Sequence, residues 1–434
     1  MIPFAEALRF WAKLGFISFG GPAGQIAIMH QELVERRRWI SEGRFLHALN
    51  YCMVLPGPEA TQLATYIGWL MHRTPGGIAA GVLFVLPSLF ILAGLSWIYV
   101  AYGDLPLVAG LFYGIKPAVV AIVVAAAHRI GSRALKNAWM WSIAAAAFLA
   151  IFVLHAPFPA IVVAAGLIGL AGGRAFPAKF SQSEQRSGAS YGSALIDDGT
   201  PSPPHARFSW RRLWVHVGVG VGMGALALAA LSAAFGWQAT LPQMGWFFTK
   251  AAFLTFGGAY AALPYVYQAA VEHYGWLSPS QMIDGLALGE TTPGPLIMVV
   301  AFVGFVGAWT KEVFGPEALP LAGIAGACVA TFFTFLPSFV FIFVGAPFIE
   351  STHGNVRFTA PLLAITAAVV GVILNLALFF AWHVLWPRGF SGPFDALAAV
   401  IGAAALFALF RWKLGVIPVI TACAALGLAA RLLT

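Results

Sequence analysis

Long apolar segments without charge recur along the whole 434-residue chain. We distinguish thirteen of them, over residues 7–28, 45–71, 77–100, 107–127, 138–154, 157–173, 213–234, 245–267, 281–308, 319–348, 358–385, 394–410 and 414–431. An α-helix needs about 20 apolar residues to cross the hydrocarbon core of a bilayer. Only 9% of the residues are charged, whereas soluble domains carry roughly 25%. The sequence therefore excludes a soluble globular enzyme and predicts an all-α polytopic membrane protein.

The chain contains an internal duplication. At an offset of 237 residues, 10–58 aligns without a gap with 247–295, and 15 of 49 positions are identical. Duplicated membrane units are typical of secondary transporters. We expect four parts: a first repeat over 1–173, a flexible cytoplasmic linker over 174–212, a connecting transmembrane helix over 213–234 and a second repeat over 235–434.

The two repeats are expected to have inverted topologies, because an odd number of predicted crossings separates equivalent points. The positive-inside rule favours a cytoplasmic N-terminus, as in a bacterial-type inner (plasma) membrane. The cluster Arg36, Arg37, Arg38 and Arg44 obeys this rule only if the first two segments of each repeat enter the membrane and return to the same side. We favour this re-entrant arrangement, and thirteen full crossings remain the alternative.

Glycine and proline motifs interrupt apolar segments at matching places in the two repeats. Phe-Gly-Gly occupies 19–21 and 256–258, and Pro-Gly-Pro occupies 56–58 and 293–295. Proline removes a helix donor, and broken backbone at membrane depth is tolerated only where protein or a cavity surrounds it. The free N–H groups and positive dipole end of a half-helix suit an anion. We predict an oxyanion site at these breaks, with kinks that only aid helix packing as the alternative.

The residues at the breaks form the predicted substrate site: Ser18, Phe19, Gly20, Gly21, Pro22, Pro56, Gly57, Pro58, Thr61, Gln62, Thr255, Phe256, Gly257, Gly258, Thr291, Thr292, Pro293, Gly294 and Pro295. The hydroxyl and amide side chains among them can donate hydrogen bonds to an oxyanion, but each is also compatible with an ordinary bond to helix backbone.

Three charged residues are candidates for charge attraction or coupling. Lys13 and Lys250 occupy the same repeat position and either attract the anion or extend to the membrane surface. Glu290 lies next to a Pro-Gly-Pro break, and an acid within an apolar span suggests a proton site. A pairing of Glu290 with Lys250, or a structural hydrogen bond to Glu290, is the alternative. Glu59 flanks the other break, and Asp284 is left open.

Other classes of function find little support. The chain lacks the nucleophile-elbow, zinc-protease and phosphate-loop motifs of common enzymes. The three cysteines, Cys52, Cys328 and Cys423, are too far apart to indicate a metal cluster or a disulfide framework. The net charge of +8 is scattered through loops, so we expect no nucleic acid, and we expect no cofactor. The charged run from Glu32 to Trp39 has the spacing of a solvated interfacial helix.

The strings FISFGGPAGQIAIMHQELVERRRWIS at 16–41 and LPGPEATQLATYIGW at 55–69 resemble the first domain of the chromate ion transporter superfamily. FLTFGGAYAALPYVYQ at 253–268 and TTPGPLIMVVAFVGF at 291–305 resemble its second domain. The resemblance implies chromate efflux with sulfate as a similar oxyanion, a bilayer environment and a possible homodimer. Its signature residues are Phe19, Gly20, Gly21, Pro22, Pro56, Gly57, Pro58, Gln62, Gly257, Gly258, Pro293, Gly294 and Pro295. Ala259 departs from the pattern, because the first repeat has Pro22 there. A sulfate or other oxyanion carrier, with proton-coupled uptake, and an anion channel remain the alternatives.

Overall fold

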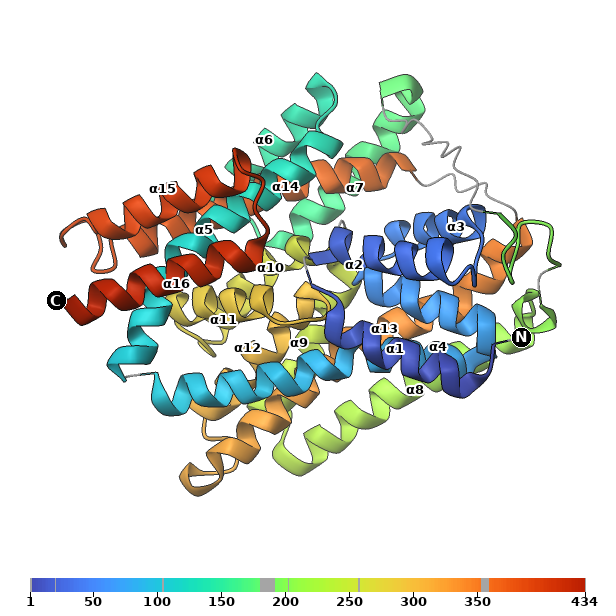
Figure 1. Cartoon of the computed structure of the whole chain (residues 1–434), viewed down its shortest axis with the longest axis horizontal. Helices are drawn as coiled ribbons and strands as arrows, with labels where there is room; N and C mark the ends of the chain where they lie inside the picture. Colours follow the sequence, from blue (N-terminus) through green and yellow to red (C-terminus); the bar gives the residue numbers. More distant parts are fainter. Residues whose placement is uncertain are drawn as a thin grey trace.

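The computed structural model describes residues 2–19, 21–103, 105–179, 192–201, 203–256, 258–352 and 359–433. Within these residues the chain forms sixteen α-helices (Figure 1), and the only β-type pairing is one isolated bridge between Ile40 and Ile196. The predicted all-α class is confirmed. Gly20 and Gly257, two predicted site residues, lie outside the described residues.

The first repeat contains seven α-helices and a short π-helix. They are α1 (Phe4–Ile17), α2 (Gly21–His30), η1 (Gln31–Arg36), α3 (Glu42–Val54), α4 (Glu59–Tyr102), α5 (Pro106–Ala134), α6 (Ala138–Phe152) and α7 (Phe158–Ala175). The predicted segment 7–28 is thus two short helices, because the glycine motif ends α1 at Ile17 and α2 starts at Gly21.

The connecting helix and the second repeat follow the same plan. They comprise α8 (Trp210–Phe235), α9 (Thr240–Leu254), α10 (Ala259–Tyr267), η4 (Gln268–His273), α11 (Pro279–Thr291), η5 (Leu296–Met298), α12 (Val299–Thr310), α13 (Leu319–Thr352), α14 (Thr359–Leu385), α15 (Ala396–Phe410) and α16 (Val416–Leu433). The two π-helices lie 237 residues apart, and so do the helix-capping residues Ser41 and Ser278. The sequence duplication is therefore also a duplication of local structure.

Seven helices of the described chain are long and apolar enough to cross a bilayer: Glu59–Tyr102, Pro106–Ala134, Phe158–Ala175, Trp210–Phe235, Pro316–Glu350, Ala360–Leu385 and Val416–Leu433. Three shorter apolar helices, Ala138–Phe152, Leu296–Thr310 and Ala396–Phe410, accompany them. The chain is a multi-pass membrane protein. Helices α1, α2, α3 and α11, which flank the glycine and proline breaks, are each shorter than a full crossing.

Helix α4 folds back on itself at His72 and Arg73, whose backbone angles are not helical. A Cβ atom on Gly68 would lie 2.5 Å from the carbonyl oxygen of Gly76, so the two parts of α4 run in close contact. The reversal lies between the predicted segments 45–71 and 77–100. The Pro-Gly-Pro break inside 45–71 separates α3 from α4, so this predicted segment is not one continuous helix.

Helices α12 and α13 form the corresponding close pair in the second repeat. A Cβ atom on Gly304 would lie 2.2 Å from the carbonyl oxygen of Gly326, and one on Gly326 would lie 2.0 Å from that of Gly304. Only glycine lets two helix backbones approach so closely. This contact joins two long elements of the membrane-embedded body.

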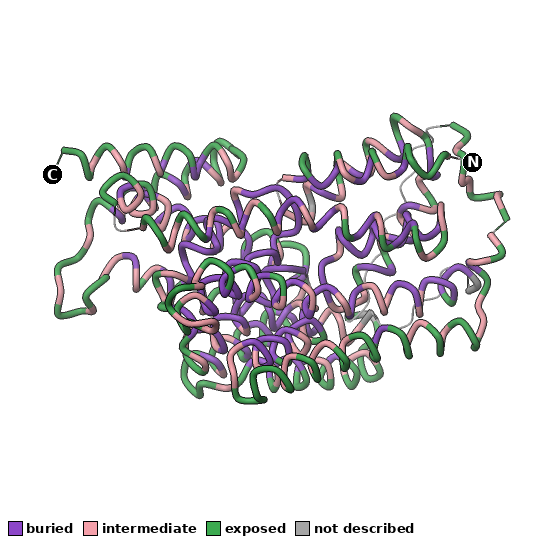
Figure 2. The backbone as a smooth tube through the Cα atoms, turned by 90° about the horizontal axis from the view of Figure 1, so that it is seen from below, coloured by how far each residue is buried: buried purple, intermediate pink, exposed green. Residues whose placement is uncertain are grey.

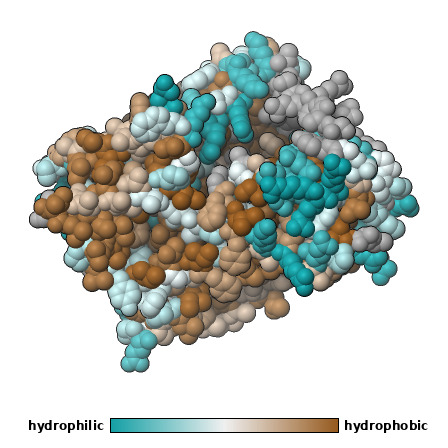
Figure 3. Space-filling view, in the orientation of Figure 1, coloured by the Kyte–Doolittle hydropathy of each residue, from teal (hydrophilic) through white to brown (hydrophobic). Residues whose placement is uncertain are grey.

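The buried part of the molecule lies where the repeats meet. One hydrophobic cluster joins first-repeat residues such as Trp11 and Tyr66 to Ile342 and Ala346 of α13. A second cluster joins α5–α7 to the second repeat. Figure 2 shows buried backbone concentrated in the middle of the molecule, between the ends that carry the termini. In Figure 3, apolar residues cover the half that carries α5, α15 and α16, while hydrophilic residues gather over α2 and α3.

Part of the predicted linker lies against the first repeat rather than away from it. Ile196 pairs with Ile40, and the Ser41 hydroxyl donates to Asp198 Oδ1 at 2.6 Å. Residues 180–191 of the linker lie outside the described residues.

We predict that Gly304→Leu destabilises the protein, because the new side chain would collide with the backbone of α13. Overpacking of this kind costs about 1–3 kcal/mol or more. The measurement is the thermal unfolding midpoint of the purified protein in detergent. The matched control is Gly222→Leu on α8, where nothing lies within 4 Å of an added Cβ atom. Equal midpoints for the two variants would contradict the close packing of α12 on α13.

Candidate functional site

Each Pro-Gly-Pro motif is held by the glycine break of the other repeat. The N–H of Gly57 donates to the carbonyl oxygen of Thr255 at 2.7 Å, and the N–H of Gly294 donates to that of Ser18 at 2.8 Å. The two donors are 237 residues apart, and so are the two acceptors. The flanking prolines carry no N–H, so the glycine supplies the only donor of each motif. Two reciprocal hydrogen bonds therefore join the four breaks in two pairs, each pair made of one break from each repeat.

The glycines of both motifs occupy backbone positions that disfavour any other residue. Gly57 has φ of 123° and Gly294 has φ of 98°, in the region that side chains rarely adopt. A Cβ atom on Gly57 would lie 2.5 Å from Ser338 Oγ, and one on Gly294 would lie 2.8 Å from Ser88 Cβ. Ser88 and Ser338 belong to matching Leu-Pro-Ser strings, so these contacts also cross between the repeats.

Several buried polar atoms near the breaks have no hydrogen-bond partner among the described residues: Ser18 Oγ, Thr61 Oγ1, Ser88 Oγ, Gln25 Oε1 and Gln62 Oε1. The amide nitrogen of Gln25 donates to the carbonyl oxygen of Gly294, and that of Gln62 donates to the carbonyl oxygen of Pro56 at 2.7 Å. Most buried polar groups are satisfied. The three hydroxyls can donate to a bound oxyanion.

The predicted threonines of the second repeat differ from these hydroxyls. Thr255 Oγ1 donates to the carbonyl oxygen of Ala251 at 2.6 Å. Thr291 and Thr292 donate to Leu288 at 3.0 Å and Gly289 at 3.2 Å, both within α11. Their protons are already used within their own helices, so among the predicted site residues the free hydroxyls are those of Ser18 and Thr61 in the first repeat.

Two acids approach the start of α10. Glu290 is buried and accepts a hydrogen bond from the hydroxyl of Tyr260. An added Cβ atom on Gly258 would lie 3.8 Å from Glu59 Oε1. The charges of Arg129 and Arg133 of α5 act on Glu290 and Glu59 respectively. The break of the second repeat thus lies beside two carboxylates.

The two predicted lysines lie apart from this cluster. Lys13 is exposed on α1, and the Lys250 ammonium lies over the ring of Trp246, 5.6 Å from its centre. Glu290 accepts a hydrogen bond from Tyr260, which agrees with the predicted alternative of a structural hydrogen bond, and no described contact joins Glu290 to Lys250. Tyr260, Arg129 and Gln25 were not recognised from the sequence.

Three other charged residues, Asp284, Arg36 and Arg37, have contacts within the described chain. Asp284 is buried and accepts a hydrogen bond from Tyr99 at 2.8 Å, with Lys116 Nζ at 3.5 Å. Arg36 pairs with Glu32 at 2.6 Å. The guanidinium of Arg37 lies 5.0 Å from the ring centre of Phe10. The last two contacts are typical of an interfacial charged segment.

The remaining described residues of the predicted site lie at the breaks, and Phe19, Phe256 and Gly258 make only local backbone hydrogen bonds there. Gly21 and Gly258 have φ of 70° and 93° and stand at the starts of α2 and α10. Phe19, Pro22 and Phe256 are half-buried. The first turn of each short helix leaves free backbone N–H groups, which suit a bound anion.

The regions of the chain that resemble known proteins correspond to the two repeats. The family described as chromate transporter matches residues 5–170 and 242–428. A probable chromate transport protein of Synechococcus elongatus is 29% identical over 94% of this chain and 90% of its own length. Chromate transport proteins of Cupriavidus metallidurans and Pseudomonas aeruginosa are 28% and 32% identical, over 87% and 98% of this chain and 82% and 91% of their own lengths. No solved structure matches the chain. The chain belongs to the chromate transporter family.

Proposed function

We propose that this protein is a secondary transporter that exports chromate from the cytoplasm by alternating access between its two repeats. Similarity to proteins named for chromate transport supports the substrate. No enzymatic role is proposed, because these relatives are named as transport proteins. The single observation that carries the site is the pair of reciprocal hydrogen bonds that joins the breaks beside the unpartnered hydroxyls of Ser18, Thr61 and Ser88.

Chromate is a tetrahedral dianion whose four oxygens accept hydrogen bonds. The hydroxyls of Ser18, Thr61 and Ser88, with the first backbone N–H groups of α2, offer donors of the right kind. Because hydrogen bonds join the breaks of one repeat to those of the other, movement of one repeat against the other would change the two hydrogen bonds together. The inverted repeats predicted from the sequence would place such a site near the bilayer midplane.

The driving force follows from the charge of the substrate. In the re-entrant arrangement the arginines at 36–38, with Arg44, lie on the same side as the N-terminus and place both in the cytoplasm of a bacterial inner (plasma) membrane. A dianion that leaves a negative interior releases about 2.3 kcal/mol per charge per 100 mV, roughly 4.6 kcal/mol in total. The membrane potential alone can therefore drive export.

Proton-coupled transport of sulfate or another oxyanion is a second candidate, and one observation favours it. Glu290 is a buried acid with a tyrosine and an arginine as partners, and export driven by potential does not require such a group. A buried ionisable residue in a membrane protein commonly marks a proton pathway. The anion channel remains a third alternative, which no contact in the described chain favours.

The proposed function is tested with everted membrane vesicles that contain the protein and are energised to be positive inside. We expect chromate to accumulate in proportion to the potential and sulfate to inhibit it. Absence of accumulation, in vesicles shown to contain folded protein, would contradict chromate export. Uptake only with an opposed proton gradient would favour the proton-coupled candidate, and single-channel currents in a planar bilayer would favour a channel.

Loss of the free hydroxyls should weaken substrate binding. A hydrogen bond to a charged group contributes about 1.5–3 kcal/mol, so Ser18→Ala, Thr61→Val and Ser88→Ala should each raise the KM for chromate about tenfold or more. Thr291→Val and Thr292→Val are the matched controls, because their hydroxyls already bond within α11. The hydroxyl site would be wrong if both groups of variants had the KM of the wild type.

Gly57→Ala and Gly294→Ala should abolish vesicle uptake, because the added atom is strained by its positive φ and also collides with the opposing repeat. The control is Gly236→Ala, which has φ of 84° but nothing within 4 Å of the new atom. The control should keep uptake at equal membrane levels, measured by immunoblot. Full uptake by both motif variants would show that close contact of the breaks is not needed.

Glu290→Gln keeps the shape of the side chain and its bond from Tyr260 but removes the titratable group. If Glu290 carries the coupled proton, the dependence of uptake on an imposed pH gradient should disappear while uptake driven by potential remains. Glu317→Gln, at an exposed position in η6 (Pro316–Ala318), is the control. An unchanged dependence on pH gradient in the Glu290 variant would remove this residue from coupling.

A further inference from the structure

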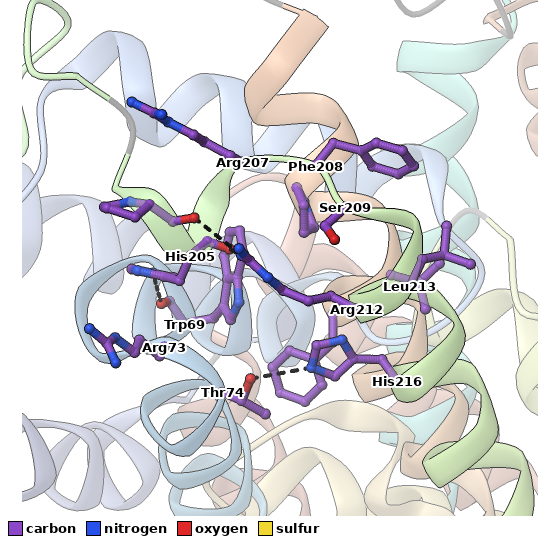
Figure 4. A pocket seen from close by; sticks show the side chains of 14 residues that line it. Trp69, Arg73, Thr74, His205, Arg207, Phe208, Ser209, Arg212, Leu213 and His216 are labelled. Atoms are coloured by element: carbon purple, nitrogen blue, oxygen red, sulfur yellow. Dashed lines mark hydrogen bonds between the residues drawn. The ribbon is translucent and has the colours of Figure 1, made fainter.

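A basic pocket lies apart from the helix breaks, where the predicted linker meets the transmembrane helices. It has a volume of about 370 Å³ and lies between the reversal of α4, the start of α8, the last part of α13 and the linker around η3 (Pro204–Ala206). Figure 4 shows the side chains that line it, with Arg212 crossing the pocket toward His205.

The pocket gathers positive charge without a compensating acid. Arg73, Arg207 and Arg212 line it together with two histidines, and no acidic residue does. None of the three arginines forms a salt bridge within the described chain. Three cations at one pocket repel one another, and a bound anion would offset that repulsion.

Backbone contacts and backbone conformation fix the positions of two of the arginines, Arg212 and Arg73. Arg212 Nη1 donates to the carbonyl oxygens of His205 at 2.8 Å and Pro204 at 3.2 Å, which holds the linker to the start of α8. Arg73 lies at the reversal of α4 with φ of 59°, a conformation that is uncommon for a residue other than glycine. Backbone strain of this kind often accompanies a binding site.

The two histidines complete the polar wall. His205 Nε2 lies 2.9 Å from the carbonyl oxygen of Trp69, and His216 Nε2 lies 3.3 Å from Thr74 Oγ1. His216 Nδ1 is buried and has no partner among the described residues. Burial lowers the pKa of His205 below its usual value of 6.5, and the charges of Arg73 and Arg212 act in the same direction.

The opposite wall is apolar and continues to the lipid-facing side of α8. Leu213, Phe343 and Val344 line the pocket. Trp210 and Trp214 of α8 are 67% and 65% exposed beside it, and tryptophans of this kind are enriched at the headgroup level of a bilayer. A ligand with an anionic head and an apolar tail matches both walls.

We propose that this pocket binds the phosphate group of an anionic phospholipid, with Arg73, Arg207 and Arg212 as its charge partners. The bound lipid would join the end of the linker to α4, α8 and α13. Basic pockets between transmembrane helices are suited to anionic headgroups, which are abundant in the cytoplasmic leaflet. This site is separate from the proposed oxyanion site, and the proposal does not rest on the transported substrate.

The test uses the full-length protein purified in detergent, with native mass spectrometry to count bound lipid and a thermal unfolding assay. The probes are dioleoylphosphatidylglycerol, dioleoylphosphatidylcholine and inorganic phosphate. We expect phosphatidylglycerol to bind and raise the unfolding midpoint, and phosphatidylcholine to do neither. If inorganic phosphate competes with the lipid at similar concentration, the phosphate site is supported but its ligand is a soluble phosphate.

The pocket variant is Arg73→Gln with Arg207→Gln, and the control is Arg388→Gln with Arg411→Gln, which removes the same charge from exposed positions elsewhere. The pocket variant should lose at least tenfold in affinity for phosphatidylglycerol, while the control keeps it. If the double variant does not fold, the single variant Arg207→Gln, at an exposed position in the linker, replaces it. Its affinity for phosphatidylglycerol should fall at least threefold. Equal lipid binding by pocket and control variants would overturn the proposal, as would the absence of phosphatidylglycerol binding.

Discussion

Backbone polar groups in the hydrocarbon core have no water to bond with, so a break in a membrane helix is tolerated only where it is buried in protein or lines a cavity. Here the partner of each break lies in the other repeat. The N–H of Gly57 is satisfied by Thr255, and that of Gly294 by Ser18. The centre of the molecule can therefore form only when both repeats are folded against each other. The shared hydrophobic clusters of α4, α5 and α13 follow from the same packing.

The two breaks are similar in backbone and different in chemistry. The first repeat contributes buried hydroxyls without partners, at Ser18, Thr61 and Ser88. The second repeat contributes threonines that are satisfied within their helices, and its break faces Glu290 and Glu59. The duplicated backbone thus carries unpartnered hydroxyls in one repeat and a buried acid beside the break of the other. This division supports the proposed transport function and gives its second candidate a structural basis.

Local motifs predicted much of the fold because their effects are local. Gly-Gly and Pro-Gly-Pro end helices through missing donors and unusual dihedrals, and α1, α3, α9 and α11 all end beside them. The reversal inside α4 was placed correctly between two apolar segments. Tyr260, Arg129 and Gln25 could not be found in this way, because their roles depend on contacts with residues 30 or more positions away. The alternative of a Glu290–Lys250 pair depended on such a contact too, and Lys250 lies over the ring of Trp246 instead.

The basic pocket shows the same limit of sequence analysis. Its arginines come from α4, the linker and α8, and nothing in their spacing along the chain predicts that they meet. The sequence by itself determined the membrane class, the duplication and the positions of the four breaks, because these follow from hydropathy, self-similarity and backbone chemistry. Only the tertiary structure decided which break bonds to which, which hydroxyls stay free and which charges gather, because those are long-range contacts set by helix packing.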